Sequence, residues 1–361
     1  MKRISQRTSW VAAALVLSLV IPIAVQLAHA DDAPKVIRFG SPFPGIGSKP
    51  VGFGNAYATA ETKALFEQEF KKDGIKVEWS NFKGAGPAVN EALANNQLDF
   101  TWIGDLPGLI GHASGIKTKL LLAGGTHINV YLAVPAGSTA KSFADLKGKK
   151  VAEFKGTAGQ LVIDKIYAKY GFTDRDFRTI SLDGATGVAA LESKNIDALW
   201  GASNLIAEQD KGAAKIIYST AKEKNDFNLA GYVLVSSDFE KKYPKIVQRV
   251  VNVLVKEAAW TSDPQNKTAV LKLWALSGIP YSSLVVDSKD VNFNQAQSPL
   301  LDEYFYSVAN HSIAVAKQDN LLRGNVDVRQ WADPHYLDVA LKTLNLTKTW
   351  TPLDANGNPA H

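Results

Sequence analysis

The chain of 361 residues contains no cysteine. It therefore forms no disulfide bond, has no thiolate nucleophile and holds no cysteine-based zinc site. It also has no cysteine that could carry a lipid. This absence excludes cysteine-dependent enzymes and cysteine-lipidated proteins from the classes of function that the rest of the sequence has to distinguish.

A strong charge imbalance is missing as well. The formal net charge is +5, and three of the positive charges lie in the first thirty residues, which contain no acidic residue. The remaining chain carries a net charge of only +2 and has no long basic run. A nucleic acid is therefore not the expected partner.

Signatures of catalytic and metal-binding sites are absent too. The six histidines are scattered, without the H-E-x-x-H spacing of a metal site. No G-x-S-x-G nucleophile motif occurs. The stretches GIGSKP and GFGNAY lack the third glycine of a dinucleotide-binding loop. The sequence thus favours a protein that is not an enzyme and that uses no cofactor or metal ion.

The first thirty residues form a segment of their own. They begin with the basic stretch MKRISQRTSW, continue with the apolar run VAAALVLSLVIPIAVQL and end in AHA before Asp31. This order is typical of a secretory signal peptide. A retained membrane anchor is the alternative, but the run is near the lower length limit for a span, and the A-x-A site favours cleavage. We expect a mature, soluble protein in the periplasm of a Gram-negative cell, beginning at Asp31.

The sequence contains an internal repeat. The stretch GAGPAVNEALANNQLDFTWIGDLP (84–107) is followed about a hundred residues later by GATGVAALESKNIDALWGASN (184–204). When one stretch is shifted onto the other, three features coincide (Ala92-Leu93 with Ala190-Leu191, Leu98-Asp99 with Ile196-Asp197, and Trp102 with Trp200). The repeat predicts that the same unit of structure occurs twice, and we expect the function of the protein to depend on both copies together.

Each copy belongs to a longer alternation of strands and helices, first from Val36 onward and again from Lys149 onward. Such alternation predicts α/β lobes with parallel sheets, and 46% hydrophobic residues in 361 suffice for two cores. The apolar strands YLAV (131–134) and YVLV (232–235) are interpreted as paired crossings between the lobes. We expect a first lobe in 31–130, an inserted second lobe in 131–235, and a return to the first lobe with C-terminal helices in 236–361.

Several motifs resemble those of a known family. They are FKGAGPAVNEALANNQLDF with IGDLP, SFADLKGKKVAEFKGTAG, NIDALW and YPKIVQRVVNVL. The chain resembles the substrate-binding proteins of the sulfonate/taurine/nitrate group of ABC importers, most closely the aliphatic sulfonate branch, from about Val36 to Leu346. It differs from that branch after the first strand, after Trp200, and in VNFNQAQSP, which has no basic residue before a Pro-Pro pair.

The resemblance implies a type II periplasmic binding protein fold, in which two lobes joined by hinge strands close on a ligand. It further implies a monomer that captures an organic sulfonate as a sulfur source and delivers it to a membrane permease with its ATPase. Nitrate, taurine or another small acid is the alternative ligand, and presentation of the ligand to a sensor is the alternative function. Desulfinases of this fold resemble a cysteine-dependent design, which the absence of cysteine excludes here.

A binding site is expected at the carboxyl ends of the strands, where open α/β sheets bind ligands. Helices that follow those strands present unpaired N–H groups and a partial positive charge, which together accommodate an anion. The predicted ligand-binding residues lie in four loops and at the end of the second copy: Ser41, Pro42, Phe43, Gly84, Ala85, Gly86, Gly104, Asp105, Thr157, Ala158, Gly159, Trp200 and Asn204.

The roles of some of these residues stay open at the level of sequence. Thr157 could cap a helix, donate its hydroxyl to the anion, or do both. Asp105 could cap the helix that begins at GDLP, or contact an amine of a taurine-like ligand. Trp102 and Trp200 could belong to the cores, but Trp200 ends its strand and is therefore placed to pack against an organic tail. Lys83 could pair with the anion or lie on the surface.

Overall fold

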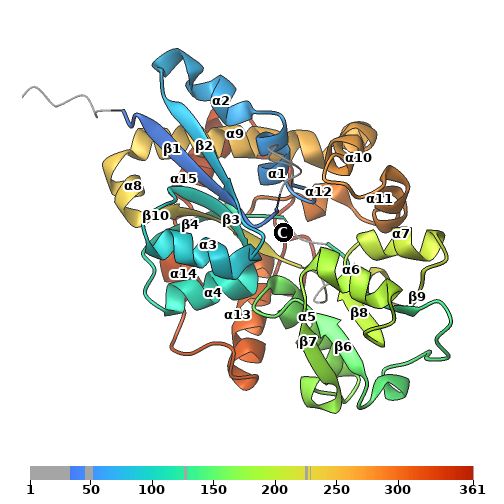
Figure 1. Cartoon of the computed structure of the whole chain (residues 1–361). Helices are drawn as coiled ribbons and strands as arrows, with labels where there is room; N and C mark the ends of the chain where they lie inside the picture. The colour runs from blue at the N-terminus through green and yellow to red at the C-terminus, as the bar shows by residue number, and fades with distance from the viewer. Residues whose placement is uncertain (1–32, 45–51, 126–127, 224–226, 228, 361) are drawn as a thin grey trace, which may run out of the picture. The chain divides into compact units, whose positions relative to one another are not determined.

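Two five-stranded sheets form the framework of the protein (Figure 1). The computed structural model describes residues 33–44, 52–125, 128–223, 227 and 229–360. The predicted signal peptide lies outside these residues. Within them, no helix has the length and apolar character needed to cross a lipid bilayer. The expected α/β fold with two lobes is confirmed, with one sheet in each lobe.

The two sheets have the same topology. The order in the first is β2 (Lys76–Asn81), β1 (Val36–Ser41), β3 (Phe100–Gly104), β10 (Gly231–Ser236) and β4 (Thr118–Ala123). The order in the second is β7 (Arg178–Ser181), β6 (Lys150–Glu153), β8 (Ala198–Gly201), β5 (Tyr131–Pro135) and β9 (Ala214–Ser219). In each sheet the first three strands are parallel, and the fourth runs antiparallel to both of its neighbours.

Helices cover both faces of the sheets and fill the C-terminal third. Their bounds are α1 (Ala56–Thr62), α2 (Leu65–Phe70), α3 (Ala85–Ala94), α4 (Asp105–Ala113), α5 (Ala158–Lys169), α6 (Gly184–Glu192), α7 (Asn204–Asp210), α8 (Ser237–Lys242), α9 (Pro244–Ser262), α10 (Lys267–Ala275), α11 (Tyr281–Asp287), α12 (Phe293–Ala296), α13 (Glu303–Gln318), α14 (Val328–Trp331) and α15 (His335–Thr343). Short 3-10 helices lie at Lys71–Asp73, Ala144–Leu146, Asp174–Asp176, Thr220–Lys222 and Pro264–Asn266.

The interpretation of 131–134 and 232–235 as paired crossing strands is wrong. These residues lie in β5 and β10, which belong to different sheets, and the predicted boundary at residue 235 falls within β10. The pairing occurs instead in the segments between the sheets, where the Leu229 N–H donates to the Ile128 carbonyl over 3.2 Å. Both apolar strands are buried on two faces, which a run of apolar residues cannot distinguish from an inter-lobe crossing.

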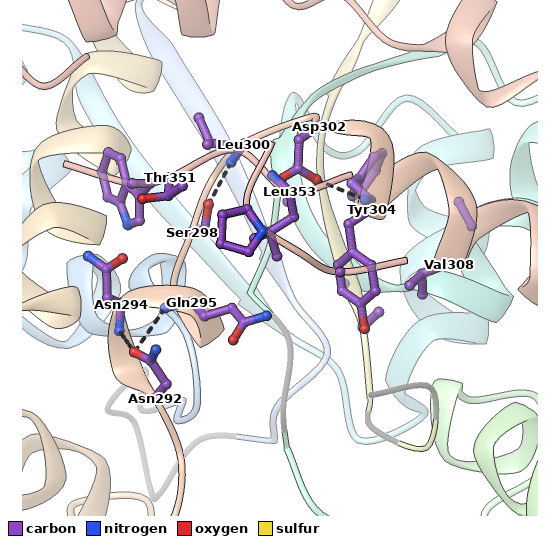
Figure 2. A pocket seen from close by; sticks show the side chains of 18 of the residues that line it. Asn292, Asn294, Gln295, Ser298, Leu300, Asp302, Tyr304, Val308, Thr351 and Leu353 are labelled. Carbon is purple, nitrogen blue, oxygen red and sulfur yellow. Dashed lines mark hydrogen bonds between the residues drawn. The ribbon is translucent and has the colours of Figure 1, made fainter. Parts of the chain in front are cut away.

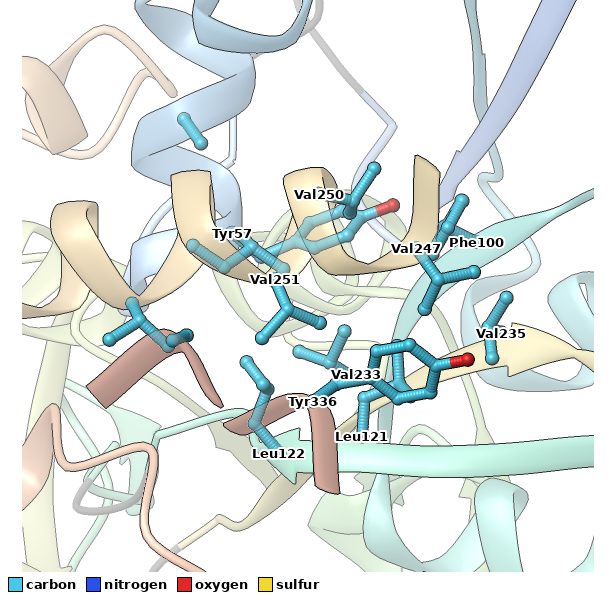
Figure 3. Close-up of a cluster of buried hydrophobic side chains, with 14 of the residues drawn as sticks. Tyr57, Phe100, Leu121, Leu122, Val233, Val235, Val247, Val250, Val251 and Tyr336 are labelled. Carbon is cyan, nitrogen blue, oxygen red and sulfur yellow. The ribbon is translucent and has the colours of Figure 1, made fainter. Parts of the chain in front are cut away.

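The first sheet lies between two hydrophobic clusters. On one face, α9 and α15 pack their apolar residues against β4 and β10, as Figure 3 shows for Val250, Val251 and Tyr336 beside Leu121 and Val233. The second cluster joins residues of the sheet to α3, α4, α13 and α14 and also contains Leu161 of α5. Because both faces are covered, the edge formed by the carboxyl ends of β1, β2 and β3 is left for a ligand.

The internal repeat has the same hydrogen bonds in both copies. The Arg38 N–H donates to Asp99 Oδ2 over 2.8 Å, and the Lys150 N–H donates to Asp197 Oδ2 over the same distance. The backbone N–H of each aspartate returns a bond to the carbonyl of the same partner. Each aspartate therefore ties the strand that follows it, β3 or β8, to the neighbouring parallel strand of the same sheet, β1 or β6.

The two aspartates should differ in their effect on stability. Asp99 is buried and also accepts two bonds from the Arg38 guanidinium, whereas Asp197 is half-buried. We expect Asp99→Ala to lower the free energy of unfolding by about 3 kcal/mol, because it leaves a partly buried charge unpaired. Asp197→Ala should cost about 1 kcal/mol, the range of one ordinary hydrogen bond. Urea denaturation measures both, and equal losses would contradict this difference.

Candidate functional site

Four helices that follow strands begin without a side-chain cap. Their N-cap residues are Gly84 for α3, Gly104 for α4, Thr157 for α5 and Ser203 for α7, and none accepts a capping hydrogen bond through its side chain. In contrast, Asp183 caps α6 by accepting the Thr186 N–H. In α4 the Asp105 N–H is already bonded to the Ala230 carbonyl and the Leu106 N–H to Asp105 Oδ1, so its start offers mainly the positive end of the helix dipole. The uncapped starts of α3 and α5 retain unpaired N–H donors as well. They are suited to an acceptor that comes from outside the chain.

Three of these helix starts converge, two from the first lobe and one from the second. A Cβ atom at Gly104 would lie 2.7 Å from Cβ of Ala158, so the beginnings of α4 and α5 are in contact. A Cβ at Gly156 would lie 3.1 Å from Cγ of Pro87, which brings in α3. The structure thus unites the predicted loops 84–86, 104–105 and 157–159 in one region. Glycine is required at Gly104, where any side chain would overlap the facing helix.

Thr157 occupies the N-cap position of α5, but its hydroxyl does not cap the helix. Thr157 Oγ1 donates to the Phe154 carbonyl over 2.7 Å. The Gly156 N–H donates to Gln160 Oε1 over 2.7 Å, so the side chain of the first turn holds the loop before the helix. The first-turn N–H groups around Ala158 and Gly159 therefore gain no acceptor from Thr157. Contact of these residues with a ligand remains a prediction.

The interpretation of Asp105 as an N-cap is wrong, because Gly104 holds that position and Asp105 is the first residue of α4. Only 3% of Asp105 is exposed. Its Oδ1 accepts the Leu106 N–H over 2.8 Å, and its Oδ2 accepts the Ser312 hydroxyl over 3.0 Å. Burial raises the pKa of Asp105, and the charge of Lys165 opposes that increase. The carboxylate thus belongs to a polar contact between helices.

Ser41 lies at the end of β1 and is buried, with 1% exposed. Its hydroxyl has no hydrogen-bond partner within the part of the chain that the structure describes. The Asn81 amide at the end of β2 donates to Glu61 Oε1 over 3.1 Å. Burial raises the pKa of Glu61 to about 7, and the bond from Asn81 opposes that increase. At neutral pH Glu61 therefore carries less negative charge than an exposed glutamate.

Phe43 links the end of β1 to the inter-lobe connection through its ring. Pro42 beside it is half-buried. The Phe43 ring stacks on Trp102 at 5.6 Å between ring centroids. Trp102 Nε1 donates to the Gly124 carbonyl over 2.7 Å, in the segment that leaves β4 for the second lobe. The aromatic pair therefore supports the edge of the first sheet where the chain crosses between lobes.

The interpretation of Trp200 as a platform for an organic tail is not supported. Trp200 is 5% exposed, packs in the core of the second lobe, and donates its indole N–H to the Tyr167 hydroxyl over 2.8 Å. A position at the end of a strand does not determine on which face of the sheet a side chain lies. The sequence alone could therefore not decide whether Trp200 belongs to the core or contacts a ligand. Asn204 begins α7 and accepts the Ala202 N–H through Oδ1 over 3.2 Å.

Ser203 was missed by the sequence analysis. Its hydroxyl is buried and finds no partner among the residues described, although serine before a helix is a common cap. The signal was present in GASN, where Ser203 precedes the first residue of α7. Like Ser41, it is an unused hydroxyl in a loop after a strand.

A cavity of about 290 Å³ lies beside the inter-lobe connections (Figure 2). It is lined by the end of β4, the start of β10, the segment 292–309 and the C-terminal segment 350–359. Its walls include the amides of Asn292, Asn294 and Gln295 and the side chains of Tyr304 and Val308. None of the predicted site residues lines it. The sequence could not show it, because its walls meet only through tertiary packing.

Glu153 ends β6, one residue before the loop that leads to α5. It is 1% exposed, and neither carboxyl oxygen has a hydrogen-bond partner within the described residues, although Lys155 Nζ lies 3.9 Å from Oε1. Burial and the charge of Asp164 raise the pKa of Glu153 to about 8. Burial and the charge of Asp319 raise the pKa of Asp164 to about 7. No group of histidines and acids among the described residues is arranged to hold a metal ion.

Comparison with known proteins identifies the family of the chain. The family described as NMT1/THI5 like matches residues 59–267. The chain belongs to the NMT1/THI5-like family. This NMT1/THI5-like protein is similar to a solved periplasmic sulfonate-binding protein of a sulfonate ABC transporter from Methylobacillus flagellatus KT. The sequences are 34% identical with a TM-score of 0.76, and the match covers 89% of this chain and 98% of that one.

Curated relatives extend the comparison. An aliphatic sulfonates-binding protein of Bacillus subtilis (strain 168) is 33% identical over 216 residues, which are 59% of this chain and 64% of that protein. The chain thus spans less than two thirds of that relative. A desulfinase for 2'-hydroxybiphenyl-2-sulfinate from Rhodococcus erythropolis is 30% identical over 161 residues, 44% of this chain and 43% of the enzyme. The resemblance to sulfonate-binding proteins expected from the motifs is confirmed.

The buried acids predict how stability depends on pH. The folded protein keeps the Glu153 proton up to a pKa of about 8, whereas the unfolded chain loses it near the ordinary value of 4.5. The free energy of unfolding should therefore fall as pH rises between these values, by up to about 1.4 kcal/mol per pH unit for this group. Glu153→Gln should flatten the profile and stabilise the protein at pH 8.

Denaturation in urea from pH 5 to 8 measures this profile. Glu192→Gln is the matched control, because Glu192 is an exposed acid of the same lobe. An unchanged pH slope in Glu153→Gln would contradict the assignment of a retained proton to Glu153.

Proposed function

We propose that this protein is the substrate-binding protein of an ABC importer and captures an organic sulfonate, of the alkanesulfonate type, for uptake as a sulfur source. The observation that carries the proposal is the convergence of the uncapped starts of α3, α4 and α5 from both lobes. The similarity to sulfonate-binding proteins supports the choice of ligand. The partners implied are a membrane permease and its ATPase, with the binding protein acting as a monomer.

The chemistry of a sulfonate suits such a site. A sulfonate is a permanent anion whose oxygens only accept hydrogen bonds, so backbone N–H groups at helix starts can bind it without a formal cation. Nitrate, taurine and other small acids could use the same donors and are the alternative ligands. Presentation of the bound anion to a sensor protein is the alternative to transport, because both would require the same closure of the lobes.

The proposal is for a binding protein and not an enzyme. A desulfinase is among the similar proteins, so the family includes catalysis. This chain contains no cysteine and cannot supply a thiolate. The histidine of α4, His112, lies in the last turn of that helix and stacks on Trp331, away from the helix start.

We further propose that the protein is exported to the periplasm and begins at Asp31 after cleavage. The basic start, the apolar run and the AHA site of the first thirty residues support this. Intact mass of the protein isolated from the periplasm is the measurement. A mass that includes residues 1–30 would contradict cleavage.

Thermal shift with a ligand panel tests the choice of anion. An alkanesulfonate or arylsulfonate should stabilise the protein by about 2.7 kcal/mol at a hundredfold excess over its dissociation constant. Taurine, nitrate and sulfate should give smaller shifts. If nitrate shifts the melting temperature and no sulfonate does, the alternative ligand replaces the proposed one.

Thr157→Asp provides the matched variant for this panel. Thr157 has the extended backbone of an N-cap, with φ −105° and ψ 168°, and aspartate is a favourable N-cap residue. The variant should fold with an unchanged or raised melting temperature, but its charge would repel an anion by several kcal/mol. Thr157→Ala should weaken binding by at most about tenfold. Binding by Thr157→Asp within threefold of the wild type would place the anion elsewhere.

A further inference from the structure

Helix α5 belongs to the second lobe but packs into the core of the first. Leu161 is fully buried within the cluster that also contains Leu106, Leu109 and Ile313 of the first lobe. Val162 and Ile166, on another side of the same helix, lie in the core of the second lobe. The position of α5 is therefore determined by contacts with both lobes, and Figure 1 shows it between the second sheet and α13.

A buried polar chain accompanies this apolar contact. Lys165 Nζ of α5 donates to the Ser312 hydroxyl of α13 over 3.2 Å. Ser312 Oγ in turn donates to Asp105 Oδ2 at the start of α4 over 3.0 Å. Lys165 is 5% exposed and Ser312 is fully buried. The chain Lys165–Ser312–Asp105, named here the inter-lobe relay, joins opposite charges of the two lobes through one hydroxyl.

The relay depends on the contact between the lobes. A buried ammonium and a buried carboxylate are unfavourable unless they are paired and hydrogen-bonded. If α5 moved away from α4 and α13, water would solvate both charges, and Ser312 would lose its donor. The relay therefore fixes one register of α5 against α4. This effect on geometry is greater than its contribution to the free energy of unfolding. The Asp105 N–H also donates to the Ala230 carbonyl over 3.0 Å, which ties the same residue to the chain that returns from the second lobe.

The register of α5 matters because its start is part of the candidate site. Lys165 lies two turns from Ala158 on the same helix, and Ala158 contacts Gly104 at the start of α4. Asp105 is the next residue of α4. Displacement of the relay would therefore change the separation between the first turn of α5 and the start of α4.

We propose that Lys165 is a positioning residue for ligand retention: the inter-lobe relay holds the starts of α4 and α5 in the register that encloses the bound anion. The proposal rests on the proposed function for the class of ligand. The relay does not contact the anion. Its loss should accelerate release of the ligand more than it slows capture, because capture begins before the lobes have closed.

Dissociation of hexanesulfonate measures this effect, by stopped-flow after dilution. Lys165→Met should raise the dissociation rate constant by at least tenfold and change the association rate constant by less than threefold. Ser312→Ala should act in the same direction. Lys169→Met is the matched control, because Lys169 lies on the same helix, is exposed and pairs with Glu223 outside the relay. It should leave both rate constants within twofold of the wild type.

A second variant separates retention from folding. Lys165→Met leaves the buried Asp105 without its opposite charge and could lower the melting temperature for that reason alone. Lys165→Met with Asp105→Asn removes both charges and should recover the melting temperature, yet it should still release hexanesulfonate at least tenfold faster. If the double variant retains the anion as the wild type does, the relay has only a structural role and the proposal is wrong.

Distances between the lobes provide a readout that is independent of the ligand's identity. The chain has no native cysteine, so a thiol-reactive spin label attaches only to cysteines that are introduced. Two exposed sites in different lobes are chosen, Glu91→Cys in α3 and Glu192→Cys in α6. With and without hexanesulfonate, the distance distribution should be broader in Lys165→Met than in Lys169→Met. If hexanesulfonate and the other anions fail to bind the wild type, the proposed function fails. Identical distributions in the two variants would overturn the relay instead.

Discussion

Unpaired backbone donors at the starts of helices are the constraint on which the rest of this structure depends. The N–H groups of the first turn of α3, α4, α5 and α7 receive no acceptor from the side chain of their N-cap residue. Gly104 cannot supply one, and it is also the residue that allows α5 to approach α4. The N–H groups of Asp105 and Leu106 that follow it are bonded within the protein, so this glycine brings the positive end of the α4 dipole close to the first-turn N–H groups of α5. An external anion completes such an arrangement at low cost, because the donors are already fixed by the sheets behind them.

Buried acids near this edge show how the surrounding charge is managed. Glu61 lies beside the end of β1, and Glu153 is the last residue of β6. Burial raises the pKa of both toward or above neutrality, so their carboxyl groups retain protons that exposed acids would lose. The positive potential of the helix starts is therefore opposed by fewer negative charges than the number of acidic residues would suggest. Lys165 and Asp105 form a separate pair of opposite charges, joined through the Ser312 hydroxyl.

Sequence patterns predicted the family, the two lobes and the loops at the strand ends, because these follow from local alternation of strands and helices. The repeat was visible because Asp99 and Asp197 perform the same bonding in each lobe. Features that depend on tertiary packing were not predicted. Trp200 has the sequence position of a ligand contact but faces a core. Asp105 has the sequence position of a cap, and its actual partner Ser312 is more than two hundred residues away. The cavity beside β4 requires segments from four parts of the chain.

The place of β10 in the first sheet has a consequence for the order in which the protein can fold. This strand is made after the whole second lobe, yet it lies between β3 and β4, which are made before it. The sheet of the second lobe uses only residues 131–219 and is continuous in sequence. During synthesis the second lobe can therefore complete its sheet first, whereas the edges of β3 and β4 that pair with β10 remain unpaired until β10 has been made. Long-range pairing of this kind slows folding. The first lobe is thus the last to become native.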